Sequence, residues 1–186
     1  MDFAAKFEEG STYAEFLSLY GNEEQQRRWK GVFDEVHLTA AQTELLASFK
    51  RDMKVVCVAG TWCGDCVNQC PIFAHFAAAT PHIQLRFFDR DAHPELAQEL
   101  AVCGAPRVPA LIFLSEDGQS CGRYGDRTLS RYRQVASDLQ GAACPTGIAP
   151  PAAEILAAVV QDWLNEFERI QLILRTSGRL RKLHGD

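Results

Sequence analysis

The stretch VVCVAGTWCGDC, residues 55–66, decides the fold class of this chain. Its first five residues form a short continuous apolar run, which is typical of a strand buried on both faces of a sheet. A turn follows at Gly60 to Trp62, and residues 63–79 then read as a helix that Pro71 is expected to kink. A Cys-x-x-Cys pair therefore stands directly between a buried strand and a helix.

The segments that follow predict the rest of the sheet. Ile83 to Phe88 reads as a second strand, so the centre of the chain is a βαβ unit, whose right-handed crossover makes the two strands parallel neighbours. Pro94 lies near the start of a short helix. Pro109 to Leu114 and Gln119 to Tyr124 read as the two arms of a hairpin. The predicted fold class is α/β, with a central mixed β-sheet flanked by helices.

Helices are also expected before the sheet. Residues 1–38 read as an N-terminal helical extension, and residues 39–140 as the core of the fold. Val32 to Leu38 is interpreted as part of a helix in preference to a short edge strand. Three capping-box pairs mark the helix starts: Thr12 with Glu15, Asn22 with Gln25, and Thr39 with Gln42.

The C-terminal third contains two more predicted helices separated by a loop. Thr128 opens the first, which carries the apolar residues Leu129, Tyr132, Ala136 and Leu139. Residues 141–151 contain three prolines and two glycines, so they are assigned as a linker. Residues 152–186 predict an amphipathic helix that docks on the core or on a partner subunit. Its apolar stripe consists of Leu156, Val159, Val160, Trp163, Phe167, Ile170 and Leu174.

Composition and charge exclude several classes of protein. The 186 residues are 47% apolar, so the chain can bury a core without disulfides, and a net charge of -5 argues against nucleic-acid binding. No signal peptide or membrane span is predicted, which makes the cytoplasm the expected compartment. Seven cysteines are an odd number, and in a reducing cytosol they indicate reactive or buried thiols.

The spacing of the two motif cysteines predicts different roles for them. Cys63 falls at the helix N-terminus, where free N–H groups and the helix dipole favour a thiolate, so it is the expected nucleophile. Cys66 lies one turn deeper and is suited to resolve a mixed disulfide. A zinc site shares this spacing, but the sequence has no second Cys-x-x-Cys or His-x-x-x-His to complete one.

The Trp-Cys-Gly-Asp-Cys motif at residues 62–66 resembles the active site of the thioredoxin family, in the form carried by a branch of bacterial thioredoxin-like proteins. Pro71 lies five residues after Cys66, like the helix-kinking proline of thioredoxins. Val108-Pro109, before an apolar strand, matches the family's cis-proline. The resemblance runs from about residue 39 to residue 139 and implies a thioredoxin-like fold, with both ends of the chain added to it.

The resemblance also implies a substrate-binding surface. Pro109 would be cis and would face the cysteine pair, and the backbone of Val108 would pair with a substrate strand. Arg107 stands next to this segment, which makes it a candidate for contacting substrate. The expected substrate-binding residues are Trp62, Gly64, Asp65, Arg107, Val108 and Pro109.

Three positions depart from the thioredoxin pattern or add to it. Asp65 replaces a proline, and its negative charge opposes a thiolate at Cys63. Cys57 stands where thioredoxins carry a buried aspartate, so the usual proton acceptor for Cys66 is missing, and water, Asp65 or another group would replace it. Cys70 shares a helical face with Cys66 and could act as a third redox residue, although packing is the favoured interpretation.

These observations predict a thiol-disulfide oxidoreductase that reduces protein or small-molecule disulfides with Cys63 and Cys66. It would need an electron-donating reductase, but no bound cofactor, metal, nucleic acid or membrane. Two alternatives remain open. One is a thioredoxin-fold interaction module with a vestigial dithiol, and the other is a metal or iron–sulfur carrier that uses Cys63, Cys66 and a further cysteine.

Overall fold

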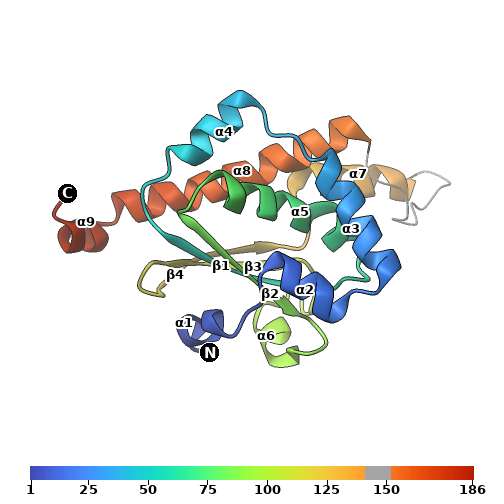
Figure 1. Cartoon of the computed structure of the whole chain (residues 1–186), viewed down its shortest axis with the longest axis horizontal. Helices are drawn as coiled ribbons and strands as arrows, with labels where there is room; N and C mark the ends of the chain where they lie inside the picture. The colour runs from blue at the N-terminus through green and yellow to red at the C-terminus, as the bar shows by residue number, and fades with distance from the viewer. Residues whose placement is uncertain (141–151) are drawn as a thin grey trace.

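Four strands form one mixed sheet at the centre of the structure, a computed structural model that describes residues 1–140 and 152–186. The strands lie in the order β2-β1-β3-β4 (Figure 1). Their bounds are β1 (Met53–Ala59), β2 (Ile83–Asp89), β3 (Ala110–Ser115) and β4 (Ser120–Gly125). β2 runs parallel to β1, while β3 is antiparallel to both β1 and β4, so the predicted βαβ unit and hairpin are both present. The predicted linker at 141–151 lies outside the described residues.

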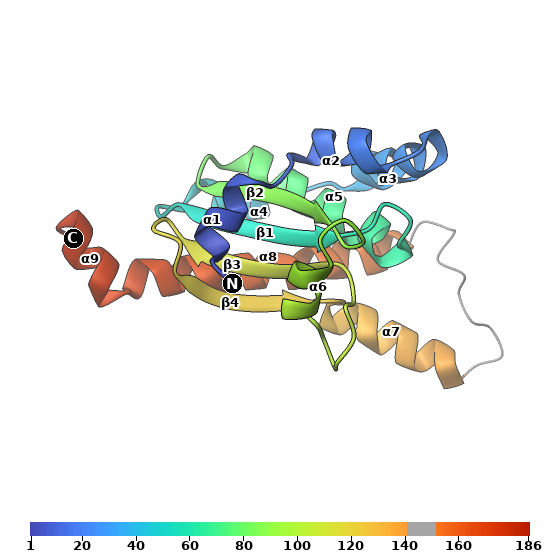
Figure 2. The same cartoon turned by 90° about the horizontal axis from the view of Figure 1, so that it is seen from below.

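Helices cover both faces of this sheet, which explains why β1 is apolar throughout its buried length. Residues 55–59 are fully buried. The helices α5 (Gly64–Ala79) and α8 (Ala153–Thr176) pack on one face, and α1 (Phe3–Glu8) and α6 (Pro94–Glu99) lie on the other (Figures 1 and 2). A strand buried on two faces and paired on both edges has no surface that favours polar residues.

The N-terminal helices are α2 (Tyr13–Tyr20), α3 (Glu23–Glu35) and α4 (Ala40–Ala47). Each begins with the capping box that the sequence predicts, in which the N-cap side chain and the third helical residue exchange hydrogen bonds. Just before α2, Ser11 and Phe87 exchange backbone hydrogen bonds of 3.0 and 2.7 Å at the outer edge of β2. This short pairing covers part of an edge strand that would otherwise present free N–H and C=O groups.

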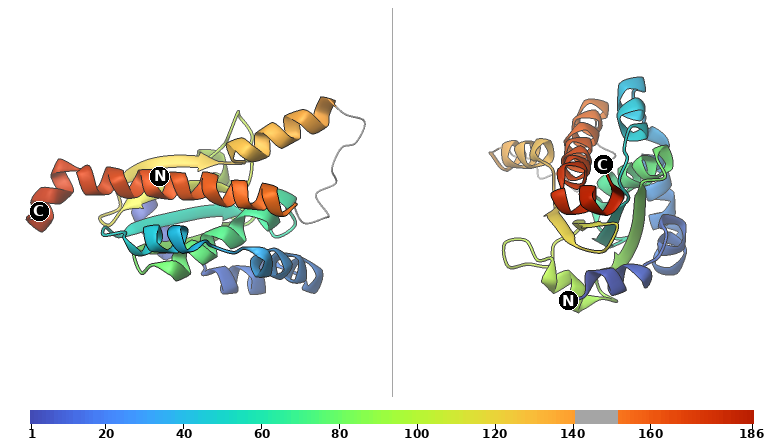
Figure 3. Two further views of the ribbon diagram at one scale, coloured as in Figure 1. Left: turned by 90° about the horizontal axis from the view of Figure 1, so that it is seen from above. Right: turned by 90° about the vertical axis from the view of Figure 1, so that its left-hand side faces the viewer.

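The helix α8 extends along the length of the sheet (Figure 3). Its predicted apolar stripe is buried, and the ring of Phe167 lies 5.2 Å from Phe76 of α5 and 5.1 Å from Phe113 of β3. Ser177 then caps α9 (Gly178–His184). Within residues 1–140 and 152–186, none of the helices is long and apolar enough to cross a membrane.

The helix α7 (Leu129–Gln140) begins directly after Thr128, as the sequence predicts. It lies beside α8, where Asp162 accepts a hydrogen bond from Ser130 N–H at 2.8 Å. Its apolar residues Leu129 and Leu139 are 53% and 76% exposed, so they are not part of the core.

Removing the Phe167 ring is expected to lower the free energy of unfolding substantially. Phe167→Ala should cost about 3–5 kcal/mol, because it empties a fully buried site shared by two helices and a strand. Leu172→Ala is the matched control on the same helix: Leu172 is 53% exposed, and its loss should change stability by less than about 0.5 kcal/mol. Urea denaturation measures both. An equally small change in stability for Phe167→Ala and Leu172→Ala would contradict the docking of α8 on the sheet.

Candidate active site

The two cysteines of the motif lie at the start of α5 at different depths. Cys63 is the N-cap residue of the helix, with extended backbone angles of φ -79° and ψ 124°. Its side chain is half-buried, whereas Cys66, one turn into the helix, is fully buried. Unpaired N–H groups and the positive end of the helix dipole favour negative charge at this position.

Cys63 faces the loop that precedes β3. Its thiol donates a hydrogen bond to the carbonyl oxygen of Val108 at 3.6 Å, and the Val108–Pro109 peptide bond is cis. Val108 and Pro109 are both buried, while the side chain of Arg107 is 44% exposed. The segment expected to contact substrate thus lies directly beside the more accessible sulfur of the pair.

The neighbours of Cys66 shift the pKa values of both thiols. The Cys66 sulfur accepts a hydrogen bond from Gly60 N–H at 3.4 Å, and the thiols of Cys63 and Cys70 lie beside it. Burial opposes ionisation of Cys66, but these neighbours outweigh it and lower its pKa. The neighbouring Cys66, and then burial, raise the pKa of Cys63. These directions favour ionisation of Cys66 before Cys63 in the reduced pair, whereas the helix dipole alone favours a thiolate at Cys63.

The carboxylate of Asp65 is paired with two arginines from the region after β4. Arg127 Nη2 lies 2.6 Å from Asp65 Oδ2, and Arg131 Nε lies 3.4 Å from Asp65 Oδ1. The three side chains are mostly shielded from solvent. The sequence suggests that Asp65 opposes a thiolate in the motif. The structure shows that this effect is reduced, because two positive charges lie next to the carboxylate.

A second carboxylate, Asp126, connects the same region to the loop before β3. Asp126 is buried and accepts hydrogen bonds from Arg107 Nη1 at 3.3 Å and from the Tyr132 hydroxyl. Burial opposes ionisation of Asp126, but these hydrogen bonds outweigh it and lower its pKa. The preceding residue, Gly125, has φ +150°, and a Cβ there would lie 2.5 Å from the carbonyl oxygen of Pro109. Glycine therefore allows β4 to approach the cis-proline loop closely.

The amide of Gln69 joins α5 to Asp126 and to the C-terminal helix. Its Nε2 donates to the carbonyl oxygens of Asp65 at 3.2 Å and Asp126 at 3.0 Å, and its Oε1 accepts from Trp163 Nε1 at 2.9 Å. Gln69 and Trp163 are both buried, so each of these hydrogen bonds is shielded from water. α8 is thereby fixed to the helix that carries the two cysteines.

The N-terminal helices hold the turn before the cysteines. The buried Trp29 donates from Nε1 to the carbonyl oxygen of Thr61 at 3.0 Å, and the Thr61 hydroxyl donates to the carbonyl oxygen of Tyr20 at 3.0 Å. The next residue, Trp62, is 43% exposed, with the guanidinium of Arg90 4.2 Å from its ring centroid. The turn is thus anchored from inside while the Trp62 ring remains on the surface.

Most residues that the sequence suggests for the site lie together. Trp62, Gly64 and Asp65 surround Cys63 in the chain, and Val108 contacts its sulfur. Sequence reasoning misses the residues that support the site, because each has a hydrogen-bonded or ion-paired partner far away in the sequence, for example 32 residues for Trp29 with Thr61 and 94 residues for Gln69 with Trp163. At residues 124–127 the sequence indicates only a turn. The missed residues are Trp29, Gln69, Asp126, Arg127, Arg131 and Trp163.

The cysteines do not form a metal centre in the part of the chain that is described. Across residues 1–140 and 152–186, His, Cys, Asp and Glu side chains form no group of three or more that could hold a metal ion. The metal or iron–sulfur carrier alternative therefore lacks support in these residues.

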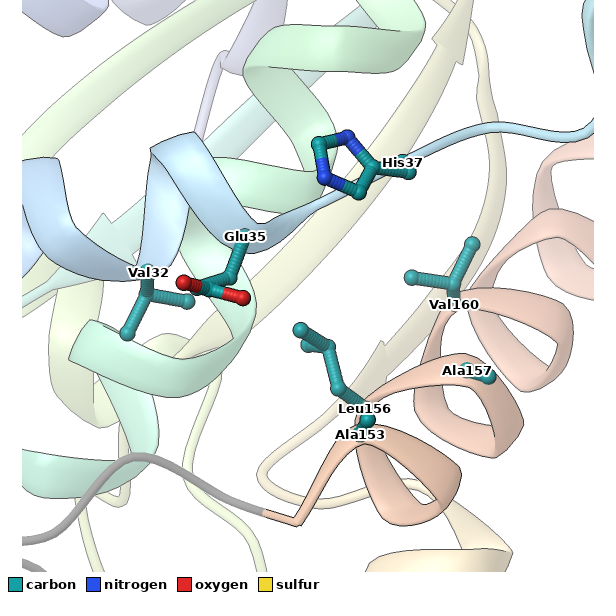
Figure 4. A pocket seen from close by; sticks show the side chains of 7 residues that line it. All are labelled: Val32, Glu35, His37, Ala153, Leu156, Ala157 and Val160. Atoms are coloured by element: carbon teal, nitrogen blue, oxygen red, sulfur yellow. The ribbon is translucent and has the colours of Figure 1, made fainter.

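A separate pocket of about 400 Å³ lies between the end of α3 and the start of α8 (Figure 4). Glu35 and His37 line it opposite several apolar residues of α8. Its lining contains none of the residues of the candidate site. The full lining is Val32, Glu35, His37, Ala153, Leu156, Ala157 and Val160.

Removing the Cys70 thiol is expected to raise the pH at which the first thiolate appears. Cys70→Ala removes a neighbouring thiol that favours the charged form of Cys66, and a loss of about 1 kcal/mol corresponds to a shift of roughly 0.7 pH units. Cys121→Ala is the matched control, since Cys121 lies on β4 away from the pair. Thiolate absorbance of the reduced proteins measures the shift. An unchanged titration in Cys70→Ala would contradict the proposed location of the charge on Cys66.

The same pKa predicts how stability depends on pH. The pKa of Cys66 is lower in the folded protein than in the unfolded chain. At any pH between these two pKa values, the unfolded state therefore binds more protons at this group than the folded state does. The reduced protein should therefore become more stable with rising pH there. Urea midpoints at a series of pH values check this, and a falling midpoint over that range would contradict it.

Comparisons with known proteins establish the family. The sequence profile of a family described as Thioredoxin matches residues 10–137. This match covers more than half of the chain and includes α2 and α3. No curated protein sequence matches significantly. Among solved structures, a Pseudomonas aeruginosa protein of unknown function has a TM-score of 0.72 and 20% identity, covering 91% of this chain and 96% of that chain. An HIV epitope scaffold has a TM-score of 0.67 and 21% identity, covering 91% of this chain and 97% of that chain. These likenesses show the fold, and the sequence match over residues 10–137 shows that the chain belongs to the thioredoxin family.

Proposed function

We propose that this protein is a thiol-disulfide oxidoreductase that reduces disulfides with Cys63 as the nucleophile and Cys66 as the resolving thiol. The observation that carries the proposal is the different depth of the two sulfurs at one helix N-terminus. Cys63 is half-buried beside the cis-proline loop, and Cys66 is fully buried one turn below. An enzyme of this class needs one thiol that substrate can reach and a second that only the mixed disulfide can reach.

In the first step, Cys63 attacks one sulfur of the substrate disulfide. The Cys66 thiolate accepts the proton of the Cys63 thiol, which lies beside it. The new bond joins Cys63 to the attacked sulfur, and the other substrate sulfur leaves as a thiolate. This proton transfer explains how Cys63 can attack although its own pKa is raised.

In the second step, Cys66 loses its proton and attacks the Cys63 sulfur of the mixed disulfide. A Cys63–Cys66 disulfide forms, and the second substrate sulfur leaves as a thiolate. In place of a buried aspartate, Cys57 lies on β1, so the departing substrate thiolate or water accepts the proton of Cys66. An electron-donating reductase then returns two electrons to the pair, in a compartment as reducing as the cytoplasm.

The surface beside Cys63 supports binding of an extended substrate. Val108 and Pro109 provide backbone next to the sulfur, and the exposed Trp62 ring provides apolar contact area. Arg107 reaches this surface while its guanidinium donates to Asp126. Both protein and small-molecule disulfides fit this arrangement, because the attacked sulfur is the one group that every substrate must share.

Replacing each cysteine in turn should separate the two steps. Cys66→Ser is expected to lose turnover but accumulate a mixed disulfide on Cys63, because attack remains possible and resolution does not. Cys63→Ser should form no adduct and have no reductase activity. Insulin reduction and non-reducing peptide mapping measure the outcomes, with Cys121→Ser as the control that retains turnover. An adduct found on Cys66 would contradict these roles.

The ion pairs of Asp65 should tune the first step. Arg127→Gln is expected to slow alkylation of the reduced pair a few-fold at neutral pH, because Asp65 then opposes the thiolate with less compensation. Adding Asp65→Asn should restore the rate. Arg123→Gln is the control, since Arg123 lies on β4 and pairs with Glu99. Slow alkylation that persists in the Arg127→Gln, Asp65→Asn double variant would contradict an electrostatic role.

A further inference from the structure

Four thiols form a continuous chain that leads from the surface into the core. Cys63, Cys66 and Cys70 follow one another along α5, and Cys57 lies on β1, on the same face of the sheet as Phe113, which packs against α8. Each thiol lies close enough to the next to shift its pKa: Cys63 acts on Cys66, Cys66 on Cys70, and Cys70 on Cys57. Apart from Cys63, each of these residues is fully buried.

The proposed reduction of substrate uses two of these thiols and leaves Cys57 and Cys70 without a role. Both are free thiols, and burial raises the pKa of each. Packing alone explains a buried cysteine, but it does not require successive thiols to lie next to one another along one helical face and the strand under it. Such contact is what thiol–disulfide exchange needs, because a thiolate must approach the sulfur that it attacks.

The helical spacing also permits a bond between Cys66 and Cys70. Residues four apart in an α-helix have Cα atoms separated by about 6 Å, which lies within the range found in disulfides. Cys66 stands between Cys63 and Cys70 on one helical face, so a thiolate on Cys70 can attack Cys66 while Cys63 departs from the other side.

We propose that Cys57 and Cys70 form a second redox pair, which exchanges with the Cys63–Cys66 pair through Cys66, so that the fully reduced protein carries two electron pairs. This inference rests on the proposed function. It predicts that the protein can reduce two disulfides before a reductase must act on it.

The transfer takes two exchanges. In the first, Cys70 attacks Cys66 in the Cys63–Cys66 disulfide: the Cys66–Cys70 bond forms, Cys63 leaves as a thiolate, and the proton of Cys70 passes to Cys63. In the second, Cys57 attacks Cys70: the Cys57–Cys70 bond forms, Cys66 leaves, and the proton of Cys57 passes to Cys66. One disulfide is broken and one is formed in each exchange, so no oxidant or reductant is consumed.

The result is a disulfide in the core and a restored dithiol at the surface. Because Cys57 and Cys70 are fully buried, a bulky reductant cannot reach their disulfide directly. Electrons leave and enter this pair only through Cys66. The Cys57–Cys70 pair would therefore be oxidised by these two exchanges and reduced by the same two exchanges in reverse.

Counting free thiols after oxidation tests the proposal. A Cys103→Ser, Cys121→Ser, Cys144→Ser variant retains four of the seven cysteines. It is fully reduced, desalted without oxygen, and mixed with excess oxidised glutathione. It is then quenched in denaturant with N-ethylmaleimide, and intact mass gives the number of labelled thiols. Peptide mapping locates the remaining disulfides.

Zero labels without bound glutathione, together with a mapped Cys57–Cys70 disulfide, are expected. Two labels, on Cys57 and Cys70, would overturn the second pair but leave the proposed function intact. Four labels would mean that the Cys63–Cys66 pair does not react, so the proposed function would fail as well. The three results are therefore distinguishable in one experiment.

Two further variants in the same background test the separate exchanges. Cys70→Ala should end with a Cys63–Cys66 disulfide and its label on Cys57. Cys57→Ala permits only the first exchange, so its label should be divided between Cys63 and Cys70. A label confined to Cys70 would contradict exchange through Cys66. If either variant fails to fold, the label count of the four-thiol protein decides the question by itself.

Discussion

The hydrogen bonds of the Gln69 amide are the interaction on which the arrangement of the site depends. From one buried side chain they connect the helix that carries the two cysteines, the carbonyl of Asp126 beside the cis-proline loop, and Trp163 of the C-terminal helix. A buried amide left without partners would cost about 1–3 kcal/mol for each lost bond, so these three elements are held in one arrangement. The site is built where they meet.

The helices outside the sheet therefore contribute to the site as well as to the core. At one end Trp29 fixes the turn before Cys63, and at the other Trp163 fixes the helix after it. Each indole combines a large apolar ring, buried in the core, with a single N–H that reaches a polar atom of the active-site region. This division of roles explains why a long amphipathic helix and the N-terminal helices accompany a small four-stranded sheet.

Short-range patterns in the sequence were sufficient for much of the fold. The capping boxes at Thr12, Asn22 and Thr39, the apolar run of β1 and the position of the cysteine pair all depend on residues a few positions apart. Three features could not be predicted in this way. The pairing of Asp65 with Arg127 joins residues 62 apart, the exposure of Leu129 and Leu139 depends on how α7 packs in the folded chain, and the low pKa of Cys66 depends on Gly60 N–H and on the neighbouring thiols.

The central claim is that the Cys63–Cys66 dithiol transfers electrons to disulfides. The most direct measurement is the rate of insulin reduction by dithiothreitol with a catalytic amount of the protein, compared between the unmodified chain and a Cys63→Ala, Cys66→Ala double variant. The unmodified protein should accelerate the reaction, and the double variant should leave it at the uncatalysed rate. Equal acceleration by both proteins would contradict the account, because electron transfer would then not depend on this pair.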